Sequence, residues 1–280
     1  MRDDAERFAA FRILFGAYLF VWFAGVLPYA PEIYGPGGLM GPHFLTPFPN
    51  LLKLLPSESG LKIFFGVSAA LAILYALGCG RRLAALALWY AWACLINRLA
   101  FLEIPSQGYV GWLLLASTLI PGGEPWAVGR KNPRWEMPKI LFVGAWIVVA
   151  LSYSVSGIPK WQSPSWRSGD ALRLILENPV ARPGVFRDLA LAMPPVVLKA
   201  ATWISLGLEL FFAPLCLFRL TRKWAWTLMV LLHVAALALF NITSVTMAML
   251  LVHLFLFDPR WLPKRQETDA ALSQVERNPE

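Results

Sequence analysis

The chain has 280 residues, of which 58% are hydrophobic and only 15% are charged, and its mean hydropathy is +0.56. Soluble domains carry about 25% charged residues, and a soluble globule of this size could not shield so many apolar side chains from water. The composition therefore excludes a soluble globule, a disordered chain and a coiled coil. It predicts an all-α polytopic membrane protein.

Eight mostly apolar runs can each form a transmembrane helix, which needs about 20 residues to cross roughly 30 Å of hydrocarbon. They cover residues 11–29, 61–77, 83–101, 108–120, 140–156, 196–218, 224–240 and 244–257. The first run is long and has no small-residue cleavage site, so we expect a helix there rather than a signal peptide. We expect about eight transmembrane helices in one domain, residues 1–262, followed by a short polar cytoplasmic tail at 263–280.

The basic residues follow the pattern of membrane topology rather than that of a nucleic-acid surface. The net charge is +8, and with a cytoplasmic N-terminus 16 of the 25 Lys and Arg residues fall on the cytoplasmic side. Because cytoplasmic loops are enriched in Lys and Arg, this distribution predicts that both termini are cytoplasmic. The expected surroundings are the lipid bilayer, with no nucleic acid, and the sequence identifies no protein partner.

Two segments on the outer side, residues 30–60 and 158–195, are too long to be simple connections, and long structured loops usually serve function. The second contains two amphipathic pieces, 170–178 and 185–193, which we expect to form short interfacial helices. Ser168 or Asp170 is a candidate cap for the first piece. Trp161 and Trp166 stand at the outer edge of the membrane, where aromatic rings meet headgroups.

Ionisable side chains at membrane depth are costly, so each is a candidate functional residue. The candidates are Arg98, Glu103, Lys160, Glu209, His233 and His253. Lys160 follows Pro159, which we expect to break the fifth helix. An amine that is partly removed from water binds its proton less tightly and can act as a base. The alternative is that Lys160 extends to the outer headgroups beside Trp161.

Glu209 lies in the middle of an apolar run, so it must be protonated or paired, with Arg98 or His233 as plausible partners. His233 is either a hydrogen-bonded packing residue or a site residue, and His43 in the first outer segment could reach the same outer cavity. The three histidines are dispersed, and the three cysteines show no ligand spacing, so we expect no metal site.

Several motifs resemble those of the vitamin K-dependent gamma-carboxylases and of their bacterial relatives, the horizontally transferred transmembrane (HTTM) proteins. Residues 156–161 (Ser-Gly-Ile-Pro-Lys-Trp) and 165–169 (Ser-Trp-Arg-Ser-Gly) resemble the signature "Gly-x-x-Lys-Leu … Trp-x-x-Gly". The run 232–242 is similar to the "Phe-His … Leu-Phe-x-Ile" helix, and 107–128 to the "His-x-Tyr … Leu-Leu … Trp-Ser-Val" segment. The similarity runs in order along roughly residues 10–262.

The resemblance implies an eight-helix bundle in a bacterial inner (cell) membrane, with quinol chemistry at the outer leaflet. The lysine that matches Lys160 is the base that deprotonates vitamin K hydroquinone in the carboxylases, so Lys160 is the implied catalytic base and His233 a helper or quinone contact. The implied cofactor is vitamin K hydroquinone or menaquinol, with no metal, and the activity would be that of a lyase-like carboxylase or epoxidase. The implied cofactor-binding residues are Trp161, Trp166, Gln107, Tyr109 and Glu209.

The sequence also departs from the carboxylase pattern. Ser106 and Gln107 replace an Asn-His pair, and Pro159 replaces a second lysine. The chain ends about twenty residues after the last expected helix, so we expect no extramembrane domain of the kind that holds a protein substrate. Two functions therefore stay open: an enzyme that acts on a quinol or another lipid-soluble substrate, and a non-enzymatic scaffold that binds lipid or a partner protein. Transport is a third, weaker interpretation, because no inverted repeat is visible.

Overall fold

The computed structural model describes residues 4–40, 47–98, 105–129 and 131–261, and within these ranges it contains helices and no β-strands. The expected tail at 263–280, His43 and Glu103 lie outside the described residues. The helices are α1 (Asp4–Val26), α2 (Ala30–Tyr34), α3 (Glu58–Leu77), α4 (Arg81–Ile96), α5 (Pro105–Leu119), α6 (Lys139–Gln162), α7 (Pro164–Ser168), α8 (Ala171–Glu177), α9 (Val185–Leu191), α10 (Pro195–Leu210), α11 (Phe212–Leu217), α12 (Arg219–Leu239) and α13 (Thr243–Leu256).

The all-α fold agrees with the prediction, but eight complete spans are not confirmed. Four helical segments are long and apolar enough to cross a membrane: residues 4–34, α3, α6 and α12. A fifth is added if α9 and α10, which meet at an angle of 105°, count as one broken span. Helices α4, α5, α10 and α13 coincide with expected runs but have only 14 to 16 residues, or about 21–24 Å of helix. This is shorter than the hydrocarbon core.

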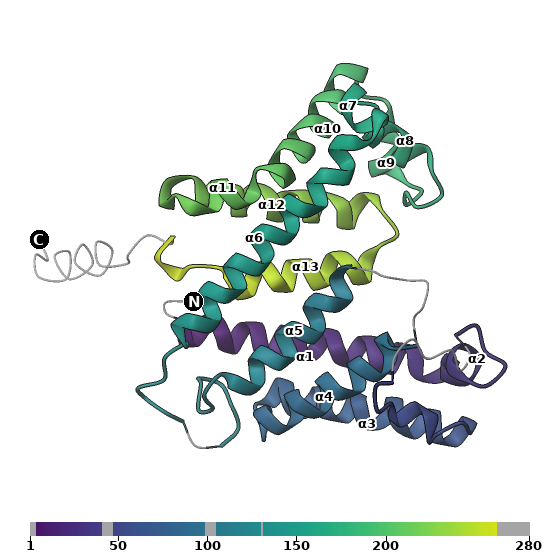
Figure 1. Ribbon diagram of the computed structural model, residues 1–280, viewed down its shortest axis with the longest axis vertical. Coiled ribbons are helices and arrows are strands. Elements are labelled where there is room, and N and C mark those ends of the chain that lie inside the picture. The colour runs from purple at the N-terminus through teal and green to yellow at the C-terminus, as the bar shows by residue number, and fades with distance from the viewer. Residues whose placement is uncertain (1–3, 41–46, 99–104, 130, 262–280) are drawn as a thin grey trace, which may run out of the picture.

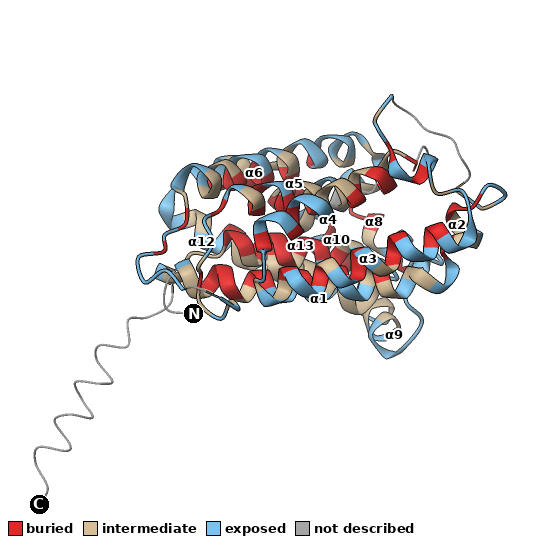
Figure 2. Cartoon of the chain, turned by 90° about the horizontal axis from the view of Figure 1, so that it is seen from below, coloured by how far each residue is buried: buried red, intermediate tan, exposed pale blue. Residues whose placement is uncertain are grey.

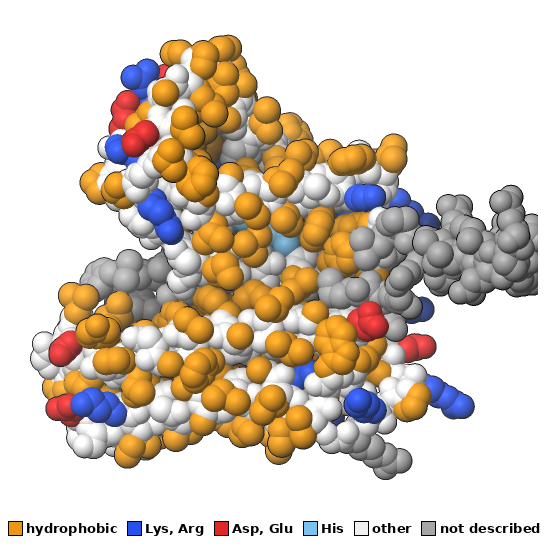
Figure 3. All heavy atoms as spheres, turned by 180° about the vertical axis from the view of Figure 1, so that it is seen from behind, with side chains coloured by type: hydrophobic (Ala, Val, Ile, Leu, Met, Phe, Trp, Pro, Cys, Tyr) orange, Lys and Arg blue, Asp and Glu red, His pale blue; other side chains and the backbone are white. Residues whose placement is uncertain are grey.

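Helices α1, α3, α4 and α5 form one half of the molecule, and α6 to α12 form the other (Figure 1). Helix α13 lies between the halves and contacts α1 and α5 on one side and α12 on the other. The buried faces of the helices point towards each other, and exposed faces point outwards (Figure 2). Hydrophobic side chains cover much of the outer surface (Figure 3), as expected for a surface that faces lipid.

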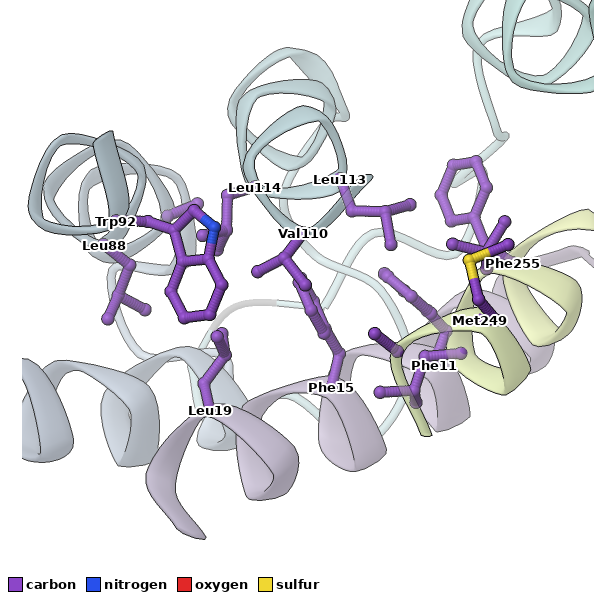
Figure 4. Packing of buried hydrophobic residues seen from close by; sticks show 14 of the residues in the cluster. Phe11, Phe15, Leu19, Leu88, Trp92, Val110, Leu113, Leu114, Met249 and Phe255 are labelled. Atoms are coloured by element: carbon purple, nitrogen blue, oxygen red, sulfur yellow. The ribbon is translucent and has the colours of Figure 1, made fainter. Parts of the chain in front are cut away.

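The core of the first half is aromatic and tightly packed. Phe11 and Phe15 of α1 point towards α13 and α5, and Leu19 points towards Trp92 of α4 (Figure 4); all three side chains are fully buried. Helix α1 approaches α3 closely at Gly16, where an added Cβ would lie 2.6 Å from the Cβ of Ala76. A larger residue would force these two helices apart, which explains glycine at this position.

Two arginines hold the ends of helices in this half. Arg12 donates to the backbone carbonyls of Tyr75 and Ala76 at the end of α3. Arg81 donates to the carbonyls of Ser117, Ile120 and Pro121 at 2.5, 2.8 and 2.7 Å, at the end of α5. The last carbonyls of a helix have no partner within the helix, so these guanidinium groups satisfy them.

Glu124 lies between the two arginines. Its Oε1 is 3.1 Å from Nε of Arg12 and 2.8 Å from Nε of Arg81. All three side chains are at most 2% exposed. We call these residues the Arg12–Glu124–Arg81 cluster. It holds two buried positive charges and one negative charge at the end of the bundle where α1 begins.

The start of α1 and the end of α13 lie at this same end, because Arg7 donates to the carbonyl of Phe257 at 2.6 Å. The opposite end carries the short helices α7, α8 and α9, which match the expected outer segment. Asp170 occupies the N-cap position of α8, but its side chain makes no capping hydrogen bond. Instead Thr202 of α10 accepts from the backbone N–H of Leu172 at 3.2 Å. The expected side-chain cap by Ser168 or Asp170 is therefore wrong, because a neighbouring helix supplies the acceptor.

Candidate functional site

Lys160 lies in the last turn of α6, and the helix is not broken before it, contrary to the sequence prediction. Helix α6 continues through Pro159 to Gln162. A proline removes one hydrogen bond from a helix, and the neighbouring turns are retained here. The helix ends only at Ser163, whose N–H donates to the carbonyls of Pro159 and Lys160 at 3.1 and 3.0 Å. Lys160 therefore extends from a helix and not from a loop.

Glu209 of α10 is the partner of Lys160. The Nζ of Lys160 lies 2.5 Å from both carboxylate oxygens of Glu209. Ser156 donates its hydroxyl to the Oε2 of Glu209 at 3.3 Å. The expected pairing of Glu209 with Arg98 or His233 is wrong, because the crossing of α6 and α10 places Lys160 against the carboxylate.

Helices α6 and α10 can approach this closely because residue 157 is glycine. A Cβ at Gly157 would lie 2.8 Å from the backbone nitrogen of Leu210. Just beyond, α10 ends and α11 begins, and Pro214 cannot donate a hydrogen bond. The hydroxyl of Ser154 accepts from the backbone N–H of Ala213 at 3.0 Å. The glycine and the serine therefore fix the contact that brings Lys160 to Glu209.

The two members of this pair differ in exposure. The side chain of Lys160 is 29% exposed, whereas that of Glu209 is 7% exposed. The Nζ of Lys160 also lies 5.1 Å from the centroid of the Trp166 ring, within cation–π range. Trp161 is largely exposed. The arrangement is an accessible amine over a buried carboxylate, beside an indole ring.

A second polar group lies deeper along α6. The hydroxyl of Tyr153 is 2.6 Å from Nε2 of His233 on α12 and 2.9 Å from Nε2 of His253 on α13. One hydroxyl has a single proton to donate, so one histidine accepts from Tyr153 and the other donates to it. Trp226 donates to the backbone carbonyl of His253 at 2.9 Å. The hydroxyl of Tyr153 thus joins three helices in a His233–Tyr153–His253 chain.

Sequence reasoning missed Tyr153, although a signal was present. It stands seven residues before Lys160, which is about two helical turns, so both side chains lie on the same side of α6. His233 is half-buried and His253 is buried. Tyr153, which is hydrogen-bonded to His233, therefore lies on the same side of α6 as Lys160.

Of the other predicted site residues, Tyr109 lies near this face, and the backbone of Gln107 is hydrogen-bonded to α4. Tyr109 of α5 approaches the side chain of Ser152 on α6. The backbone carbonyl of Gln107 accepts from Nε1 of Trp92 at 2.9 Å, which places Gln107 against α4. No hydrogen bond within the described ranges joins Gln107 to Lys160.

An exposed ion pair lies further out, between Asp170 and Lys199, 3.4 Å apart. The hydroxyl of Ser168 donates to Asp170 at 2.7 Å. This hydrogen bond, with the nearby charge of Lys199, lowers the pKa of Asp170 below its ordinary value. Among the described residues, no group of three His, Cys, Asp or Glu side chains is close enough together to hold a metal ion.

The apolar helices and the polar residues buried between them define an all-helical membrane protein. The HTTM domain family matches residues 2–261 of the chain. The chain therefore belongs to the HTTM domain family, which confirms the resemblance inferred from its motifs. No curated protein and no solved structure matched.

Proposed function

We propose that the chain binds a lipid-soluble hydroquinone at the outer leaflet and that Lys160 takes a proton from it. The observation that carries the proposal is the pairing of a 29%-exposed amine with a 7%-exposed carboxylate at 2.5 Å. Buried titratable groups with a specific charged partner are frequent at functional sites. A lysine that only anchored the interface would not need a buried carboxylate beneath it.

A proton can move between Nζ of Lys160 and the carboxylate of Glu209 without changing the net charge of the pair, which gains one positive charge only when it takes a proton from a substrate. When the proton between Nζ of Lys160 and the carboxylate rests on Glu209, the pair consists of an amine and a carboxylic acid. Once the O–H of Glu209 turns away from Nζ, the lone pair of the amine can accept a hydroxyl proton from a bound substrate. Afterwards the proton resides on Lys160, Glu209 stays protonated, and the negative charge remains on the substrate oxygen.

The residues present fit a flat aromatic diol. Trp166 offers an aromatic face beside the amine, and Lys160 can accept or donate at a phenolic oxygen. When bound, a hydroquinone would supply the reducing equivalents for an oxygen-dependent reaction. His233 is hydrogen-bonded at 2.6 Å to Tyr153, which lies on the same side of α6 as Lys160, so we propose it as a second polar contact. Tyr109, Gln107 and Trp161 are proposed as outer contacts.

The decisive experiment compares variants of purified protein in lipid nanodiscs supplied with reduced vitamin K or menaquinol and oxygen. Mass spectrometry would measure the quinone epoxide. Lys160→Ala should abolish product, and Lys160→Arg should abolish it too, because arginine can pair with Glu209 but cannot give up its proton in a protein. The matched control is Lys199→Ala, which removes the exposed outer pair and should leave product unchanged.

Two results would contradict the base assignment: full activity in Lys160→Arg, or equal loss in Lys199→Ala. If the unsubstituted protein forms no product at all, the scaffold becomes the better interpretation. One observation favours that second candidate. Val185 and Phe186 of α9 are 63% and 62% exposed, so this short helix offers an apolar face to lipid or to a partner.

We also propose that the membrane is a bacterial inner membrane and that both termini face the cytoplasm. The contact between Arg7 and Phe257 supports a common side for the two ends of the bundle. Cysteine-accessibility labelling at residues 3 and 270 in intact cells would test this orientation. Labelling by an impermeant reagent from outside would contradict it.

A further inference from the structure

The hydroxyl of Tyr153 contacts two histidines, and the direction of these two hydrogen bonds decides what His233 can bind. An unpaired positive charge is costly at membrane depth, so both imidazole rings are neutral. A neutral imidazole carries one N–H and one lone pair, and a tyrosine has one proton to donate. One histidine therefore receives the tyrosine proton at Nε2, and the other donates its Nε2–H to the tyrosine oxygen. The surroundings of the two rings show which is which.

The ring of His253 is enclosed by the protein. It is 1% exposed, and it lies between the rings of Tyr153 and Trp226, with centroid distances of 5.8 and 6.2 Å. Its Nδ1 is buried and has no hydrogen-bond partner in the described part of the chain. If Tyr153 donated to this ring, Nδ1 would carry a buried N–H without an acceptor, a situation that is rarer in proteins than an unused lone pair. His253 therefore carries its proton on Nε2 and donates it to Tyr153.

The two distances indicate the same order. Hydrogen bonds from N–H to oxygen are typically about 2.9–3.0 Å long, and hydroxyl donors form shorter ones. The Tyr153 hydroxyl is 2.9 Å from Nε2 of His253 and 2.6 Å from Nε2 of His233. The longer contact fits an N–H donor and the shorter one a hydroxyl donor. The chain thus runs from His253 through Tyr153 to His233.

His233 stands at the open end of this chain. Because its Nε2 accepts, its own proton is on Nδ1. The side chain is only half-buried, and unlike His253 it has no enclosed nitrogen without a partner. A histidine side chain is visible at the surface of the middle part of the molecule, among hydrophobic side chains (Figure 3). A donor in such surroundings requires an acceptor, because hydrocarbon offers none.

We propose that His253 and Tyr153 hold His233 in the tautomer that donates from Nδ1, and that this N–H binds an acceptor oxygen of a lipid-soluble molecule. The identity of the molecule rests on the function proposed above, for which the acceptor is a quinone carbonyl or a quinol oxygen. Hydrogen bonds in a chain strengthen one another, so this N–H is a better donor than that of an isolated imidazole. Tyr153 and His253 are positioning residues, since they act through His233.

The first measurement needs no ligand. Solid-state ¹⁵N NMR of the full-length protein in lipid nanodiscs, labelled at the histidine rings, distinguishes a protonated ring nitrogen from a bare one. His43→Gln and His233→Gln would assign the signals. We expect His233 to be protonated at Nδ1 alone and His253 at Nε2 alone. A proton on Nε2 of His233 in the unsubstituted protein would overturn the proposal.

The second measurement adds oxidised vitamin K, which has two carbonyl oxygens and no hydroxyl group. It should shift the Nδ1 signal of His233, and the titration gives an apparent affinity. Tyr153→Phe should let His233 populate both tautomers and weaken quinone binding about three- to tenfold, the value of one neutral hydrogen bond. The matched control is Tyr18→Phe, which removes an exposed hydrogen bond to Ser244 and should change neither result.

An unmoved His233 signal at saturating quinone, or equal quinone binding by the unsubstituted protein and Tyr153→Phe, would overturn the proposal. The epoxide assay separates this result from the function proposed above. Epoxide formation that depends on Lys160, without a response of His233 to quinone, would keep the base assignment and reject the role of His233. A shifted His233 signal without epoxide would support the role of His233 and reject the base assignment.

Discussion

Glu124→Ala should destabilise the protein strongly, because it removes the only negative charge of the Arg12–Glu124–Arg81 cluster. Both guanidinium Nε atoms lie next to the same carboxylate oxygen, at 3.1 and 2.8 Å, so they are at most about 6 Å apart. At an effective dielectric constant of about 20, two unit charges at that separation repel by about 3 kcal/mol. Removing one partner of a buried ion pair typically costs about 3–5 kcal/mol. We expect a loss near the lower value, since both arginines keep their backbone acceptors.

The assay is reversible unfolding of the purified protein in mixed micelles, with increasing SDS and tryptophan fluorescence as the signal. Glu124→Gln should recover part of the loss, because the amide oxygen can still accept a hydrogen bond from one arginine. The control is Glu58→Ala, which removes a pair between two exposed side chains, Glu58 and Lys62, and should change little. If Glu124→Ala unfolds at the same SDS fraction as the unsubstituted protein, the electrostatic account of this cluster is refuted.

Three further changes test the packing described above. Gly157→Leu should force α6 away from Leu210 and separate Lys160 from Glu209, at a cost of about 1–3 kcal/mol, measured by the same SDS titration. Tyr153→Phe should leave two imidazole nitrogens without their shared hydroxyl, at about 1–3 kcal/mol, in the same assay. Thr202→Val should remove the acceptor at the start of α8 and raise hydrogen exchange of its first turn, for a loss of about 1 kcal/mol.

Each of these changes has its own control or contrary result. For Gly157, the control is Gly144→Leu on the same helix, where an added Cβ meets nothing within 4 Å, and equal loss in both variants would contradict the close-approach argument. For Tyr153, the control is Tyr18→Phe, which removes an exposed hydrogen bond of 3.2 Å to Ser244. For Thr202, unchanged exchange at Leu172 would show that the hydroxyl does not cap α8.

The sequence was sufficient for the fold class and for the positions of the helices, because both depend on the length and apolarity of each run. It was insufficient for the number of spans, since α4, α5, α10 and α13 end before they reach the length of the hydrocarbon core. Helix ends depend on local contacts that a hydropathy pattern does not contain. Pro159 is an example: proline predicted a break, and the helix continued for three more residues.

The residues of the candidate site could be predicted from the sequence, but the contacts between them could not. Lys160 and Glu209 were both identified from the cost of burying charge. Their contact depends on Gly157, which allows two helices far apart in sequence to touch. Tyr153 could have been found from its spacing to Lys160, but its two histidine partners come from α12 and α13. Such partners follow from helix packing, which motif spacing along a single helix does not reveal.

The two ionic contacts inside the bundle lie at opposite ends of the molecule, with the Arg12–Glu124–Arg81 cluster in one half and the Lys160–Glu209 pair in the other (Figure 1). Each contact fixes how far its helices can shift along their axes. A shift of one turn would leave a buried charge without its partner in an apolar environment. Neither contact restrains tilting of one half against the other. Each contact therefore opposes sliding of helices within its own half, whereas the two halves are held together by the packing of α13 against α1, α5 and α12.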